Sequence, residues 1–236
     1  NRQYTADKEK NMIYPSLKGV KYINEEVKEY LYFMGNRQLP TETDFPTLYP
    51  FLKYKLNKRH METLIKIDYF KDFSKQVKLL TYMDYVENIF DKKQYRKEQI
   101  PPNMISFLAK HSNRQTDKTI YVTEEEAPIL HADLFSILPN IETSIIGKVK
   151  NEVELLGEVR SQLPDGCTVG VAGARVKNKP CFLFKSWKNA KEVWINLDSN
   201  MLMPNRDDVV MLYNIESYEQ NRRTNYHADI EIIKEA

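Results

Sequence analysis

The chain has 236 residues, 42% of them hydrophobic, which is enough for one large or two small packed domains. Its formal net charge is only +2, so charge alone does not mark it as a nucleic-acid-binding protein. Two cysteines without a C-x-x-C spacing and four scattered histidines argue against a metal site, and no apolar run approaches the ~20 residues that a membrane-spanning helix needs.

The distribution of charge and cysteine gives a first indication of organisation and compartment. Basic residues are in excess over residues 1–100, whereas acidic residues are in excess over 101–165. Cys167 and Cys181 are expected to be reduced core thiols, which we favour over a disulfide. With no signal peptide at the start, these features predict a soluble cytoplasmic protein. A first residue of Asn1 instead of Met suggests a piece of a longer polypeptide.

Residues 1–97 are predicted to form a mostly helical domain. Asn24 is a suitable N-cap for a helix that Gly35 would end, and Asn57 is a suitable N-cap for a second helix. A broad apolar face predicts a third helix from about Phe73 to Phe90.

A short glycine turn precedes the first of these helices. Leu17-Lys18-Gly19-Val20 is followed by a further basic residue, Lys21. A glycine lets backbone N–H groups approach a phosphate closely, and flanking lysines add charge. The turn therefore predicts a grip on one DNA strand, and the alternative is an ordinary helix-turn-helix without a ligand. The candidate DNA contacts are Lys18, Gly19, Val20, Lys21, Lys58 and Arg59, although the last two could simply solvate the start of a helix.

Residues 98–141 have the composition of an acidic linker. Pro101 and Pro102 are expected to break any helix, and the polar stretch that follows contains one apolar island, Ile129 to Leu138. A connecting helix is then predicted within residues 142–165.

The C-terminal region, residues 166–236, is predicted to be a small closed barrel. Five strand-like segments follow one another, at about 167–176, 180–186, 192–198, 208–216 and 225–234. Alternation along the second segment places Phe182 and Phe184 in the core and Lys185 on the outside. The expected fold class is therefore α+β and multidomain, with a helical domain, a linker and a five-stranded barrel.

In their order, these segments resemble the region after the fingers of bacterial and phage replicative DNA polymerase III alpha subunits, the C-family polymerases. Leu56-Asn57-Lys58-Arg59, Leu64-Ile65-Lys66 and Phe70 are similar to the helix behind the helix-hairpin-helix of that family. The chain differs from the usual sequence of that family at two positions. Lys21 stands where the hairpin usually has its second glycine, and Asp68 stands where the segment after the following helix usually has a glycine.

The resemblance implies two further sites. His131-Ala132-Asp133-Leu134-Phe135 is similar to the family's sliding-clamp-binding peptide, with His131 in place of the usual glutamine. The alternative is that this segment docks the linker onto its own protein. The barrel resembles an oligonucleotide-binding (OB) fold, in which exposed aromatic and basic side chains bind single strands. The candidates are Arg175, Lys177, Lys185, Trp187, Trp194, Arg222 and Arg223.

The resemblance also implies a role. The chain would be a non-catalytic part of a replicative polymerase that supports processive synthesis by holding duplex and single-stranded DNA, a sliding clamp and the catalytic domains. No palm sequence is present, so Mg²⁺ would be needed only in the absent palm, and no cofactor is expected in this chain. Two alternatives are a stand-alone DNA-binding or scaffold subunit of a replisome, and an RNA-binding OB module of another enzyme.

Overall fold

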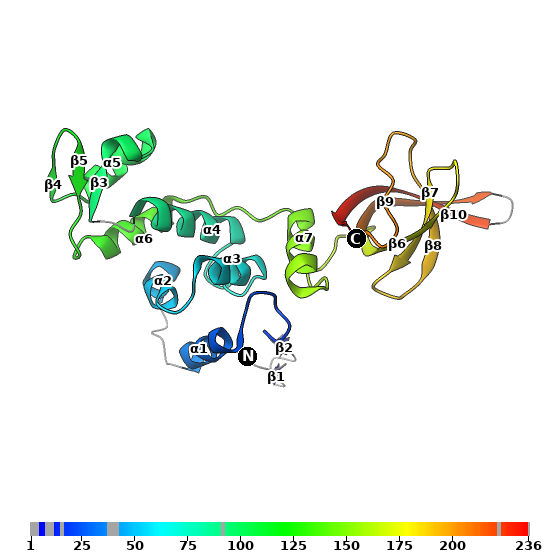
Figure 1. The fold of residues 1–236 in the computed structure, drawn as a ribbon, viewed down its shortest axis with the longest axis horizontal. Coiled ribbons are helices and arrows are strands. Elements are labelled where there is room, and N and C mark those ends of the chain that lie inside the picture. Colours follow the sequence, from blue (N-terminus) through cyan, green and yellow to red (C-terminus); the bar gives the residue numbers. More distant parts are fainter. Residues whose placement is uncertain are drawn as a thin grey trace. The chain divides into compact units, whose positions relative to one another are not determined.

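The computed structural model describes residues 5–7, 12–14, 17–36, 43–90, 93–220 and 223–235. The chain divides into two compact units, Asn1–Thr143 and Ser144–Ala236, each with its own set of elements (Figure 1).

Unit 1 begins with a short antiparallel pair, β1 (Thr5–Asp7) and β2 (Met12–Tyr14). Four α-helices follow: α1 (Glu25–Asn36), α2 (Phe45–Lys53), α3 (Lys58–Lys66) and α4 (Gln76–Tyr85), the last extended by a π-helical turn, Val86–Phe90.

Two predicted N-caps of unit 1 are confirmed. The Asn24 Oδ1 accepts a hydrogen bond from the Val27 N–H at 2.9 Å. The Asn57 Oδ1 accepts from the His60 N–H at 2.9 Å, and the His60 ring accepts in return from the Asn57 N–H. Each cap satisfies an N–H group that the first helical turn leaves without an intrahelical partner.

The third helix starts later than predicted. Phe73 lies before α4 and packs its ring 6.0 Å from that of Phe45, between centroids. The Asn140 side chain accepts hydrogen bonds from Ser74 Oγ and the Lys75 N–H, at 2.9 and 3.1 Å. This contact, from a residue 65 positions away, holds the chain just before the helix begins, and no local pattern reveals it.

The segment predicted as a linker, residues 98–141, contains regular secondary structure. It holds the 3₁₀ turn Lys97–Gln99, α5 (Pro102–Lys110), β4 (Arg114–Gln115), β5 (Thr119–Tyr121) and α6 (Ala127–Ile137). Together with β3 (Gln94–Arg96), the strands form a small sheet in the order β3-β5-β4. The expectation that Pro101 and Pro102 break any helix was wrong, because Pro102 stands at the first turn of α5, where proline is well tolerated.

Unit 2 begins with α7 (Ile145–Leu156), which is part of the barrel unit. Ser144 Oγ caps it by accepting from the Gly147 N–H at 3.1 Å. Val149 and Val153 on α7 form one buried cluster with Val169, Met211 and Ile233 of the barrel.

The barrel is closed and has five strands, as predicted. They are β6 (Thr168–Arg175), β7 (Cys181–Ser186), β8 (Glu192–Asn196), β9 (Val209–Gln220) and β10 (Arg223–Lys234), in the order β10-β8-β7-β6-β9. All neighbours are antiparallel except β8 and β10, which are parallel. This is an OB-like arrangement. Figure 1 shows β9 and β10 continuing beyond the barrel as a hairpin.

The barrel core follows the predicted alternation. Phe182 and Phe184 are buried together with Ala172, Ile195 and Leu212, and Lys185 is exposed. A Cβ on Gly170 would lie 2.1 Å from the Lys185 carbonyl oxygen and 2.6 Å from the Phe184 ring. The first barrel strand therefore requires glycine where it crosses β7.

Candidate nucleic-acid interface

The glycine turn before α1 is anchored by apolar side chains. Leu17 and Val20 are buried, whereas Lys18 and Lys21 are exposed. Gly19 has a φ of +85°, a conformation that favours glycine, and nothing lies within 4 Å of where its Cβ would be. The Val20 N–H donates to the Leu17 carbonyl oxygen at 3.3 Å, so Val20 stabilises the turn.

The start of α3 brings one further candidate to this turn. The Arg59 guanidinium lies 3.5 Å from the centre of the Tyr22 ring, and Tyr22 directly follows Lys21. Stacking uses the face of the guanidinium and leaves N–H groups at its edge for a phosphate. Arg59 and the turn thus form one exposed basic surface, defined by Lys18, Lys21 and Arg59.

Lys58 points to a different set of partners. Its Nζ lies 3.5 Å from Asp84 Oδ1 and 3.6 Å from Glu87 Oε2. Slight desolvation lowers the pKa of Lys58, but the charges of Glu87 and Asp84 outweigh it, so that the pKa is raised. Lys58 is therefore paired within unit 1.

The predicted clamp-binding segment lies within α6. Leu134 is fully buried, the Phe135 ring stacks on the Phe45 ring at 6.1 Å between centroids, and the Lys78 Nζ lies 4.4 Å from the centre of the Phe135 ring. His131 Nδ1 lies 3.1 Å from the Tyr82 hydroxyl, and Asp133 Oδ2 lies 3.4 Å from His111 Nε2. In this structure the segment packs against its own unit in a helical conformation.

The barrel candidates divide into different settings. Arg175 donates to the carbonyl oxygens of Met203 and Pro204 and to Asn205 Oδ1, at 2.6 to 3.0 Å, and so holds the loop before β9. Lys177 is exposed in the turn between β6 and β7. Arg222 lies outside the described residues, and for Arg223 the position at the start of β10 is described, but not its side chain.

Lys185 and Trp194 share the outer surface of β7 and β8. Leu183 pairs directly with Trp194 across the two strands, and Lys185 pairs with Glu192, whose carboxylate lies 3.7 Å from its Nζ. Trp194 is 45% exposed. Two residues along β8, the Asn196 Nδ2 donates to the Tyr218 hydroxyl at 3.3 Å and to the Tyr226 carbonyl oxygen at 3.2 Å.

These contacts define a surface that we name the β7–β8 face. It consists of Leu183, Lys185, Trp194, Asn196 and Tyr218. Tyr218 is 43% exposed, so the face presents two aromatic side chains and a lysine to solvent. Bases stack on such aromatic groups, and a lysine attracts the phosphate backbone.

The sequence did not reveal Asn196 and Tyr218 as part of this face. Asn214 has a φ of +51°, and the β9–β10 register shifts between His227 and Asp229. This irregularity interrupts the regular alternation of inward and outward side chains along β9. Counting from the core residues of β9 therefore does not show on which side of the strand Tyr218 lies.

The described part of the chain offers few other kinds of site. No group of three or more His, Cys, Asp or Glu residues there could hold a metal ion, and no helix there is long and apolar enough to cross a membrane. Cys167 and Cys181 are both free thiols, and burial raises the pKa of Cys181 against a smaller opposing effect of Lys179.

No protein-family model matches the chain, and no curated protein matches it significantly.

Proposed function

We propose that the chain is a non-catalytic DNA-binding protein whose barrel, as an OB fold, binds single-stranded DNA on the β7–β8 face. The observation that carries this proposal is the placement of Trp194 and Tyr218, both exposed, on one face and linked through Asn196. In OB folds the second and third strands carry the oligonucleotide, and here those strands are β7 and β8.

Charge around the face suits a nucleic-acid backbone. Lys185 lies on the face, and Lys177 and Lys179 are exposed in the turn between β6 and β7. That turn corresponds to the first binding loop of an OB fold. Nearby Glu192 limits the positive charge, so stacking is expected to supply more of the affinity than ion pairing does.

Unit 1 supplies the second part of the proposal. The exposed basic surface of Lys18, Lys21 and Arg59 would grip duplex DNA through the glycine turn. The described elements on either side of this turn are β2 and α1, whereas a helix-hairpin-helix has two helices there. Together with the resemblance to C-family polymerases, this basic surface supports a role as the DNA-holding part of a replicative polymerase.

Clamp binding by residues 131–135 stays a prediction. A clamp peptide binds in an extended form, so α6 would have to unwind and Leu134 would have to leave the core of unit 1. Leaving that core costs free energy, which the clamp would have to offset.

The proposal is tested by measuring binding of a fluorescent single-stranded DNA of twelve nucleotides by anisotropy. Replacing either Trp194 or Tyr218 with Ala should weaken binding by about 5- to 150-fold, because one stacked base contributes ~1–3 kcal/mol. The control is Leu202→Ala, which removes an exposed apolar side chain outside the face and should leave affinity unchanged. Equal affinity of all four proteins overturns the proposal. Markedly tighter binding of RNA of the same sequence would assign the barrel to RNA.

A further inference from the structure

A cavity of about 700 Å³ lies in unit 2, away from the core of the barrel. One wall is the loop after α7, residues 157–166, and the other is formed by the start of β6 with Trp187 and Lys188. Its volume falls within the range of ligand pockets in proteins, about 300–1,000 Å³.

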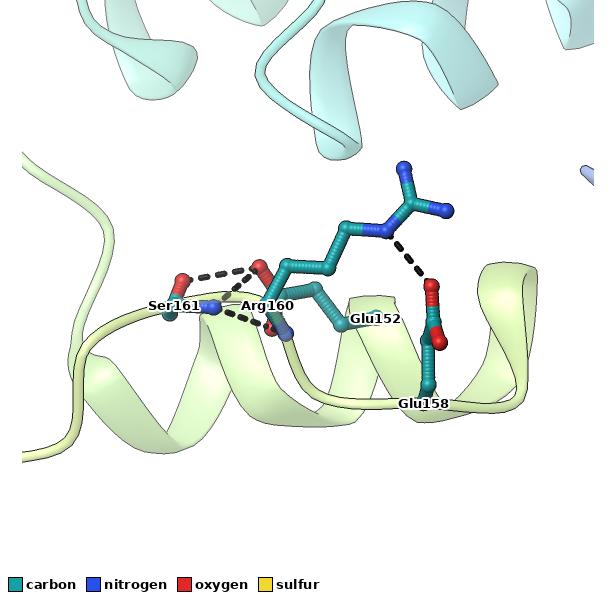
Figure 2. Close-up of polar contacts among 4 residues, drawn as sticks. All are labelled: Glu152, Glu158, Arg160 and Ser161. Atoms are coloured by element: carbon teal, nitrogen blue, oxygen red, sulfur yellow. Dashed lines mark hydrogen bonds and ion pairs between the residues drawn. The ribbon is translucent and has the colours of Figure 1, made fainter. Parts of the chain in front are cut away.

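The loop wall is held in place by one buried carboxylate. Glu152 of α7 accepts hydrogen bonds from the Arg160 N–H at 2.9 Å, the Ser161 N–H at 3.0 Å and the Ser161 Oγ at 2.8 Å (Figure 2). The Arg160 side chain turns to Glu158, with Nε 2.7 Å from Oε1. These hydrogen bonds to one carboxylate hold residues 160 and 161 of the loop against α7.

The opposite wall is also fixed. The Trp187 backbone N–H donates to the carbonyl oxygen of Val169 in β6 at 3.0 Å, which continues the pairing of the two strands one residue past the end of β7. The Lys188 N–H donates to Ser186 Oγ at 3.2 Å. Trp187 is 38% exposed and lines the cavity, so its indole is available for stacking.

The chemistry of the lining suits a nucleotide. An aromatic ring can stack on Trp187, Lys188 can pair with a phosphate, and the carboxylates of Glu158 and Asp165 can accept hydrogen bonds from the amino group of a base. A purely anionic ligand would be repelled by those carboxylates. A lipid tail could form no hydrogen bond with the Asp165 carboxylate.

Trp187 of the cavity follows the outward residues of β7 in sequence. Outward side chains on β7 come at every second residue, Leu183 and then Lys185, and Trp187 comes two residues later, directly after the strand ends at Ser186. We propose that the cavity binds a single unstacked nucleotide of the strand that lies on the β7–β8 face, with its base on Trp187 and its phosphate at Lys188. That a DNA strand lies on the β7–β8 face is the proposed function, and this inference rests on it.

Trp187 and Trp194 are the two tryptophans of the chain, so each site has its own fluorescent reporter. Trp194→Phe leaves Trp187 to report on the cavity, and Trp187→Phe leaves Trp194 to report on the face. Each variant is titrated with the single-stranded DNA and, separately, with a nucleoside monophosphate, and emission is corrected for absorption by the ligand.

We expect the DNA to quench both variants. Quenching of Trp194 alone would overturn the cavity proposal and leave the proposed function standing. Quenching of Trp187 alone would support the cavity and overturn the β7–β8 face. The nucleoside monophosphate distinguishes a free nucleotide from a nucleotide of the DNA strand. If it quenched Trp187 saturably at concentrations similar to those of the DNA, the cavity would be a site for free nucleotides, and its assignment to the DNA strand would be overturned.

A matched pair of lysines tests the phosphate contact. Lys188→Ala should raise the dissociation constant measured by Trp187 by about five-fold, the effect of ~1 kcal/mol. Lys191 is exposed on the same turn but does not line the cavity, so Lys191→Ala should have no effect. Equal effects of the two variants would overturn the role of Lys188.

Discussion

The Arg59 guanidinium lies 3.5 Å from the centre of the Tyr22 ring, and this contact joins the start of α3 to the glycine turn. A cation at a helix N-terminus opposes the helix dipole, which disfavours it by a few tenths of a kcal/mol to about 1 kcal/mol. The stacked tyrosine offsets part of that cost and holds the cation beside Lys21. The relationship makes Arg59 a DNA-contacting candidate, whereas its neighbour Lys58 is paired internally.

The two neighbouring basic residues therefore give a direct test of the duplex grip. Arg59→Ala should weaken binding of a blunt duplex and reduce the slope of log affinity against log salt by about one, because one phosphate contact is lost. Lys58→Ala should leave the slope unchanged, since Lys58 is engaged with Asp84 and Glu87. Anisotropy across a salt series measures both, and an equal loss of slope in the two variants would contradict the internal pairing.

Gly19 and Gly35 should respond to alanine with opposite signs. Gly19 has a φ of +85°, so Gly19→Ala should destabilise unit 1 by about 1 kcal/mol. Gly35 lies within α1, and nothing stands within 4 Å of its Cβ position, so Gly35→Ala should stabilise by about 0.5–1 kcal/mol. Urea denaturation followed by circular dichroism measures both changes. A neutral Gly19→Ala would show that the turn does not require the left-handed conformation.

Leu134 decides between the two interpretations of α6. Because Leu134 is fully buried, Leu134→Ala should destabilise unit 1 by about 3 kcal/mol. Ile137 lies on the same helix with 57% exposure, and Ile137→Ala should cost less than about 1 kcal/mol. Thermal melts measure both. If the two variants melt alike, α6 is loosely held, and the clamp prediction gains support.

The sequence predicted local features well and long-range ones poorly. The caps at Asn24 and Asn57 and the core placement of Phe182 and Phe184 follow from contacts within three residues or from strand alternation. By contrast, Asn140 holds the chain before α4 from 65 positions away, and the side of β9 on which Tyr218 lies depends on an irregularity near Asn214.

The linker prediction failed for a physical reason of its own. Polar composition between Pro102 and Glu126 suggested no core, yet Leu108 and Ile120 are both fully buried. A few apolar side chains at the right spacing are sufficient for short elements that pack on a larger unit, and average composition does not show this.

The loop that Glu152 holds offers a last prediction, which separates structure from binding in unit 2. Glu152→Gln keeps one acceptor oxygen but turns an NH₂ donor toward the N–H groups of residues 160 and 161, so that a part-buried N–H group loses its partner. We expect a loss of about 1–3 kcal/mol in the free energy of unfolding of unit 2. The matched control is Glu154→Gln, on the exposed side of α7, which should be neutral. Urea denaturation followed by tryptophan emission in the Trp194→Phe background measures the change beside the cavity. If Glu152→Gln were as stable as the control, the loop would be held by other contacts, and the cavity would not be preformed by this carboxylate.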